Sequence, residues 1–101
     1  MDRTRPFAET VTRRLRDDPA FAPALLTEAI QALLDGEVDL GVLLLRQTVE
    51  GTIGFDRFSA LAGIPRTEAD AMLQTGTRVE ARTLLPALAR LREELGPVET
   101  A

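Results

Sequence analysis

Apolar residues recur at intervals of three and four along almost the whole chain, and this spacing limits the fold more than any other feature of the sequence. The clearest stripe consists of Phe21, Leu25, Leu26, Ala29, Ile30, Leu33 and Leu34. It follows the 3.6-residue period of an amphipathic helix. Sustained alternation of apolar and polar residues is missing, and no hairpin dipeptide lies between two apolar runs. The spacing therefore predicts an all-α fold, a compact bundle of five to six short helices.

Capping residues, prolines and glycines divide the chain into the predicted helices. These are a stretch after Pro6 with Phe7, Val11 and Leu15, a segment from about Pro19 to Asp35, Leu40–Val49, Asp56–Gly63, Ile64–Gln74, and a last segment with Leu84, Leu88, Leu91 and Leu95 that ends at Gly96. Asp18, Asp39 and Asp56 are the expected N-caps, because a short carboxylate can accept a hydrogen bond from a free N–H of the first turn. Gly63 is the expected stop of the fourth helix.

The start of the last helix has two interpretations. Thr77 and Glu80 have the spacing of a capping box, but a helix that begins there carries Pro86 in its interior. An interior proline costs about 3 kcal/mol. We therefore expect the helix to begin near Arg82 or Thr83, so that the proline falls in the first turn. The leucine stripe of this helix predicts intradomain core, with a dimer seam as the alternative.

The residue types that are missing exclude most catalytic chemistry. Cys, His, Tyr, Trp, Lys and Asn do not occur in the chain. A zinc site of the usual kind, a disulfide, a thiolate nucleophile, an imidazole base and a lysine Schiff base are therefore excluded. Carboxylates, several threonines and Ser59 remain, and no acidic pair stands out from surface charge. We expect neither an enzyme nor a cofactor.

The length of 101 residues is enough for one domain with one core. We expect an N-terminal arm or docked satellite helix at 1–17, a helical domain at 18–96 and a tail at 97–101. The start of the chain is charged instead of apolar, and the longest strongly apolar run, Leu40 to Leu45, is far shorter than the ~20 residues of a membrane span. A cytoplasmic protein without a membrane segment is expected.

The formal net charge of −4 is distributed unevenly along the chain. An acidic stretch at 17–50 lies between basic stretches at 1–16 and 51–92, and all 12 basic residues are arginines. The simplest interpretation of the acidic stretch is a solvated face. The use of arginine alone is more typical of a GC-rich genome than of a binding signature.

The segment from Phe55 to Gln74 predicts a helix-turn-helix. Two short helices cross closely when a small residue lies at their contact, a residue that tolerates positive φ lies in the turn, and apolar residues seat both helices. Ser59 supplies the first and Gly63 the second. The apolar residues are Phe58, Ala62, Ile64, Ala69 and Met72 or Leu73. The alternative is a helical hairpin that only packs.

The same region resembles a known family. The residues that carry the resemblance are Asp18-Pro19-Ala20-Phe21, Leu43-Leu44-Leu45-Arg46, the run from Gly54 through Gly63-Ile64-Pro65 to Arg66, and Arg82-Thr83-Leu84-Leu85. In order and spacing they are similar to the Xre/Cro-type antidote proteins of bacterial addiction modules, the HigA-like antitoxins. The resemblance covers about Asp18 to Gly96 and implies a lambda-repressor-like helix-turn-helix fold.

This resemblance implies a function as well. Such proteins bind a palindromic double-stranded DNA operator as homodimers, repress their own operon, and neutralise a small toxin, commonly of the RelE/ParE fold. By position, Arg66 falls where family members commonly carry an arginine at the start of the recognition helix. The acidic residues Asp35, Glu37 and Asp39 would then be able to attract a basic toxin.

The predicted DNA-binding residues are Arg57, Arg66, Thr67, Asp70, Gln74, Arg78 and Arg82. Arg66 and Gln74 are the candidates for base edges, and Arg57, Arg78 and Arg82 are the candidates for phosphates. Thr67, Asp70 and Gln74, like Ala71, match exposed positions of the recognition helix by spacing only. For each arginine the alternative is a solvated side chain or an ion pair. The rival function is a protein-interaction module with a helix-turn-helix-like fold that does not bind DNA.

Overall fold

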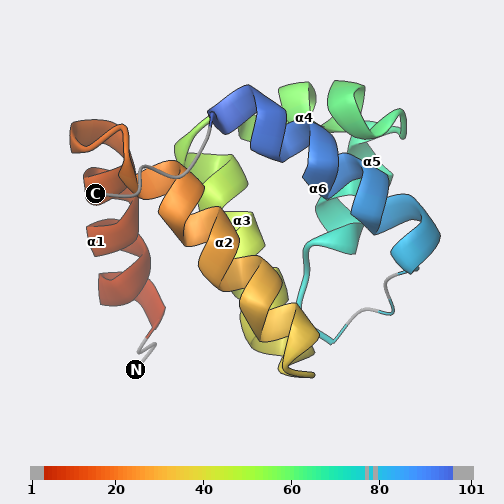
Figure 1. The fold of residues 1–101 in the computed structure, drawn as a ribbon, viewed down its shortest axis with the longest axis horizontal. Coiled ribbons are helices and arrows are strands. Elements are labelled where there is room, and N and C mark those ends of the chain that lie inside the picture. The colour runs from red at the N-terminus through yellow and green to blue at the C-terminus, as the bar shows by residue number, and fades with distance from the viewer. Residues whose placement is uncertain (1–3, 77, 79, 97–101) are drawn as a thin grey trace.

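The computed structural model describes residues 4–76, 78 and 80–96, with side chains from Glu9 onward within these ranges. This part of the chain forms six helices and no strand, which confirms the predicted all-α class (Figure 1). The helices are α1 (Thr4–Asp17), α2 (Phe21–Leu34), α3 (Val38–Gly51), α4 (Gly54–Ala62), α5 (Arg66–Met72) and α6 (Ala81–Leu95). The predicted tail at 97–101 and the side chain of Phe7 lie outside the described residues.

The helices form two groups that share α3. α2 runs diagonally across the molecule and α3 returns beside it, while α1 packs against both (Figure 1). In the second group α4 contacts α3, α5 and α6, and α6 closes the bundle by contacting α2. The α4–α5 pair is therefore mounted on α3 from one side and on α6 from the other.

One hydrophobic core joins both groups. Its most deeply buried large side chains come from α2, α3, α4, α6 and the segment after α5, and they are Leu26, Leu45, Val42, Val49, Phe58, Leu91 and Leu73. From α1, Val11 and Leu15 enter the same core. The first helix is thus docked on the domain through these two residues. Since about 25 cal/mol is gained per Å² of apolar surface removed from water, this shared burial is the main favourable term for the fold.

The leucine stripe of α6 belongs to the core. Leu84, Leu88 and Leu91 are buried, and Leu95 packs against the cluster at its edge. The burial of these leucines agrees with the prediction that the stripe belongs to the core of the domain. These side chains are not available as a dimer seam.

None of the three predicted N-caps occupies the N-cap position of its helix. α2 begins at Phe21 and its N-cap residue is Ala20, which makes no side-chain cap hydrogen bond. Asp18 lies two residues earlier, in the turn before α2, where its Oδ1 accepts a hydrogen bond from the N–H of Ala20 at 3.1 Å. The prediction for Asp39 is wrong, because α3 begins at Val38 and the Asp39 carboxylate accepts from the N–H of Gly76 at 3.0 Å instead. The prediction for Asp56 is also wrong, because α4 begins at Gly54 and Asp56 lies inside its first turn.

The last helix begins one residue before the predicted start, at Ala81. Pro86 consequently lies inside the helix instead of in its first turn, which corrects the prediction. The N–H that proline lacks would otherwise bond the carbonyl of Arg82. Because Pro86 is exposed, this carbonyl lies on the solvent side of the helix. The penalty is therefore lower than for a buried proline.

Among the residues that the structure describes, no helix combines the length and the apolar content that crossing a membrane requires.

Candidate nucleic-acid interface

A tight turn at residues 63–65 connects α4 to α5. Gly63 adopts the left-handed conformation with φ 69° and ψ 30°, and its N–H bonds the carbonyl of Ser59 at 2.9 Å. The Ser59 hydroxyl donates to the carbonyl of Ile64 across the turn. Pro65 then extends the chain at φ −61° and ψ 151° and places Arg66 as the first residue of α5. Ser59 and Gly63, which the sequence analysis selected for the helix contact and for the turn, therefore both lie at the α4–α5 turn.

α5 is seated by one face only. Ala69 and Met72 are buried, as is Leu73 directly after the helix, while Phe58 of α4 lies beneath them in the core. Ala62 and Ile64 are partly buried against the same core, as predicted. The opposite face and the segment just beyond it are exposed at Arg66, Thr67, Glu68, Ala71 and Gln74.

An arginine of α3 ties α5 to the body of the molecule. Arg46 places Nη2 3.2 Å from Oδ1 of Asp70 and Nε 3.0 Å from Oε1 of Glu50. Its guanidinium lies 5.0 Å from the centroid of the Phe55 ring. The second oxygen of Asp70 accepts from Nε2 of Gln74 at 3.1 Å. Both carboxylate oxygens of the predicted DNA contact Asp70 are thus engaged within the molecule.

Sequence reasoning did not select Arg46 as a residue of the site. Its bond to Glu50 is predictable from the sequence, because side chains four residues apart on a helix are neighbours. Its bond to Asp70 joins residues 24 positions apart, and no local sequence pattern predicts it. Arg46 is therefore a positioning residue for α5 that only the folded chain reveals.

Two of the four predicted arginines are paired with carboxylates. Arg66 bonds Asp56 of the preceding helix, and its guanidinium lies 5.6 Å from the Phe55 ring centroid. Arg57 of α4 binds Glu94 of α6 through two bonds of 3.1 and 3.2 Å. The hydrogen bond and the charge of Glu94 raise the pKa of Arg57.

The other two arginines have no ion-pair partner among the described residues. Arg78 and Arg82 are exposed, at the end of the loop after α5 and in the first turn of α6. Arg78 lines a hollow of about 350 Å³ between α5 and the start of α6. The other lining residues are Ile64, Glu68, Ala71, Met72, Glu80 and Thr83. This hollow brings Arg78 next to the exposed face of α5.

The four arginines predicted to contact DNA do not form one group in the structure. Arg57 is bound at Glu94, close to the C-terminal end of α6, whereas Arg82 lies at the N-terminal end of the same helix. Twelve residues of helix separate these positions by about 18 Å. The structure thus gathers Arg66, Thr67, Gln74 and Arg78 around α5 and leaves Arg57 at a distance from Arg82.

Comparison of the chain with protein-family models, with curated proteins and with solved structures finds no match. Among the described residues, no group of carboxylates is arranged to hold a metal ion.

Proposed function

We propose that this chain is a cytoplasmic DNA-binding regulator in which α4 and α5 act as a helix-turn-helix. In this proposal α5 enters the major groove and no cofactor takes part. The observation that carries it is the exposed outer face of α5. The opposite face of the helix packs on the core through Ala69 and Met72, and Asp70 of α5 is bonded to Arg46 of α3. Direct readout of base edges requires a helix that is held in place by packing on one face and presents polar side chains on the other.

The charges divide the DNA contacts into two classes. Arg78 and Arg82, which have no ion-pair partner among the described residues, are the phosphate contacts. Arg66 and Gln74 are the contacts to base edges. Arg66 is able to exchange Asp56 for DNA, because the Asp56 side chain is 87% exposed and a solvent-exposed pair contributes only about 0–1 kcal/mol. Arg57 has to give up two bonds to Glu94, so it is the weakest of the phosphate candidates.

Binding to a selected duplex tests this function. DNA from a library of randomised duplexes is selected on the full chain, and the recovered sequence is titrated by fluorescence anisotropy at several salt concentrations. We expect saturable binding whose affinity falls steeply between about 50 and 200 mM salt, since each arginine that neutralises a phosphate releases counterions. Arg78→Ala and Arg82→Ala should each reduce the slope of log affinity against log salt by about one.

The variant Arg66→Ala separates base contacts from phosphate contacts. It should weaken binding to the selected sequence by about 1–3 kcal/mol while it changes binding to an unrelated duplex little. Arg13→Ala is the matched control, because Arg13 is an exposed arginine of α1, a helix that packs on α2 and α3. Absence of saturable binding at the lowest salt, or equal losses for Arg66→Ala and Arg13→Ala, would overturn the proposal.

A protein-interaction module is the second candidate, and the pairing of Arg57 and Arg66 with carboxylates favours it. Its partner would be a basic protein held by the exposed acidic residues Asp35, Glu37 and Asp39. The resemblance to antidote proteins points to a small toxin in this role. This alternative requires no DNA binding at any salt concentration, together with co-purification of a small basic protein encoded by the adjacent gene.

A further inference from the structure

Among the described residues, Glu94 of α6 pairs with one arginine, and this arginine belongs to the proposed helix-turn-helix. The two carboxylate oxygens of Glu94 accept from Nε and Nη2 of Arg57 at 3.1 and 3.2 Å. Two parallel bonds between a guanidinium and a carboxylate are stronger and better defined in direction than a single bond. The pair therefore links the first turn of α4 to the last turn of α6.

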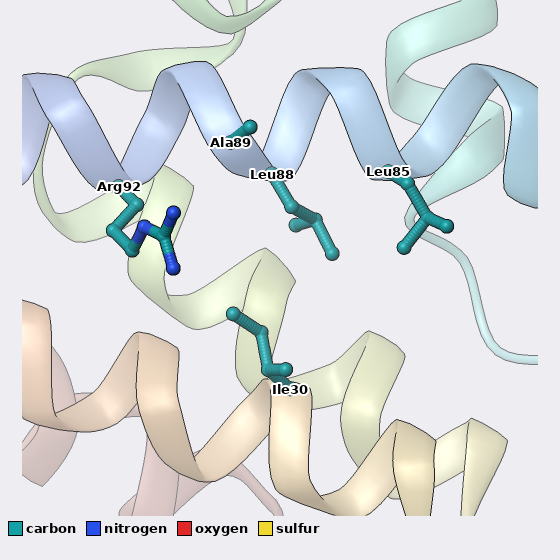
Figure 2. Close-up of a pocket in the computed structure, with 5 residues that line it drawn as sticks. All are labelled: Ile30, Leu85, Leu88, Ala89 and Arg92. Carbon is teal, nitrogen blue, oxygen red and sulfur yellow. The ribbon is translucent and has the colours of Figure 1, made fainter.

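The other arginines in this part of α6 are directed elsewhere. Arg90 precedes Glu94 by four residues and is its neighbour on the helix, but its Nη1 donates to the carbonyl of Leu61 at 2.6 Å. Arg92 points from α6 toward α2, where it lines a hollow of about 160 Å³ (Figure 2). The carboxylate of Glu94 is thus left to Arg57.

Arg57 lies where a helix-turn-helix meets the DNA backbone. The first helix of such a motif crosses the backbone while the second enters the major groove. The residue before Arg57 is Asp56, which bonds Arg66 at the start of α5, so Arg57 lies beside that start. Its side chain is 51% exposed and therefore accessible to a phosphate. A phosphate also binds a guanidinium through two oxygens, so Glu94 and DNA compete for the same donors.

We propose that Glu94 limits the affinity of the chain for DNA by holding Arg57 away from the phosphates. This inference rests on the proposed DNA-binding function, and Glu94 acts in it as a positioning residue. While the pair is closed, Arg57 neutralises no phosphate and releases no counterion. Glu94 is less easily displaced than Asp56, because its side chain is 34% exposed and makes two bonds, whereas the Asp56 side chain is 87% exposed.

The variant Glu94→Gln tests this role, because it keeps the shape of the side chain and removes its charge. The full chain is titrated with the selected duplex by fluorescence anisotropy at several salt concentrations. Glu94→Gln should raise the affinity about three- to tenfold at about 100 mM salt and steepen the slope of log affinity against log salt by about one, since Arg57 becomes a phosphate contact. The gain should be similar on an unrelated duplex, because phosphate contacts carry no sequence information. Circular dichroism checks that the variant keeps its helix content.

Two controls separate the ion pair from net charge. Glu93→Gln removes the same charge from the neighbouring position, where the carboxylate is exposed and has no ion-pair partner among the described residues. It should change the affinity less than about twofold and leave the salt slope unchanged, because exposed charges are screened. Arg57→Gln alone should change the affinity little. In the Arg57→Gln background, Glu94→Gln should have no larger effect than Glu93→Gln.

The outcomes distinguish this inference from the function on which it rests. Absence of saturable binding by the unmodified chain and by every variant would overturn both. If the chain binds DNA, three results would overturn the role of Glu94 alone and leave DNA binding intact. They are equal effects of Glu94→Gln and Glu93→Gln, a gain that persists in the Arg57→Gln background, and a gain confined to the selected sequence.

Discussion

At the scale of single residues, two glycines have different physical roles. A Cβ on Gly51 of α3 would lie 2.3 Å from Cδ1 of Leu15, so the absence of a side chain allows α1 to approach α3. A Cβ on Gly63 would meet no atom within 4 Å, but the residue has φ +69°. Gly51 is therefore required for space, and Gly63 is required for conformation, as the turn motif predicts.

The conformation of Gly63 leads to a stability prediction. Gly63→Ala should lower the free energy of unfolding by about 1–2 kcal/mol, the typical cost of placing an L side chain in the left-handed region. Gly63→Asn should cost less, because asparagine visits this region more readily. Urea unfolding of both variants, followed by circular dichroism at one protein concentration, measures the difference. Equal losses in the two variants would show that backbone conformation is not the cause.

At the scale of helices, the prolines near the starts of α5 and α6 have different effects on helical hydrogen bonding. Pro65 precedes α5 in an extended conformation, where it lacks no helical hydrogen bond. Pro86 lies in the second turn of α6 and removes a bond to the carbonyl of Arg82. The first turn of α6 is nevertheless formed, because the N–H groups of Thr83 and Leu84 both bond the carbonyl of Glu80. α6 therefore contains a local defect that its packing tolerates.

Removal of this defect should stabilise the protein. Pro86→Ala restores the missing N–H and should raise the free energy of unfolding by about 1–3 kcal/mol. Ala81→Pro is the matched control at the first helical position, where proline is tolerated and where the preceding Glu80 is already extended. It should change stability little. The same urea titration reports both, and a loss of stability in Pro86→Ala would contradict the account.

At the scale of the whole molecule, a few long-range polar contacts fix the position of the α5 region. Arg46 bonds Asp70 from α3, and Asp39 at the start of α3 bonds the N–H of Gly76 in the loop after α5. The guanidinium of Arg46 lies partly buried against Phe55, with Nη1 buried and without a partner among the described residues. These contacts, together with the core, hold the outer face of α5 in one orientation.

Loss of the Arg46 contacts should loosen α5 more than the remaining fold. Arg46→Ala should lower the free energy of unfolding by about 1–2 kcal/mol, from partly exposed ion pairs and the lost contact with the ring. Arg46→Lys should recover only part of this, because lysine lacks the planar fork that reaches two carboxylates. Hydrogen exchange should show faster exchange of α5 amides than of α2 amides in Arg46→Ala. Uniform exchange across both helices would contradict this role of Arg46.

The sequence by itself determined the helices, the turn at Gly63 and the residues that seat α5, since helix periodicity, left-handed glycine and apolar faces depend on neighbours within a few positions. Only the tertiary structure decided how the charges pair. Asp39 and Asp56 read locally as caps, yet one bonds Gly76 and the other Arg66. Arg57 meets Glu94 across 37 residues, and the exposure of Leu85 depends on where α6 crosses α2. Such contacts depend on how whole helices pack against one another, and the spacing of residues within one helix does not determine this packing.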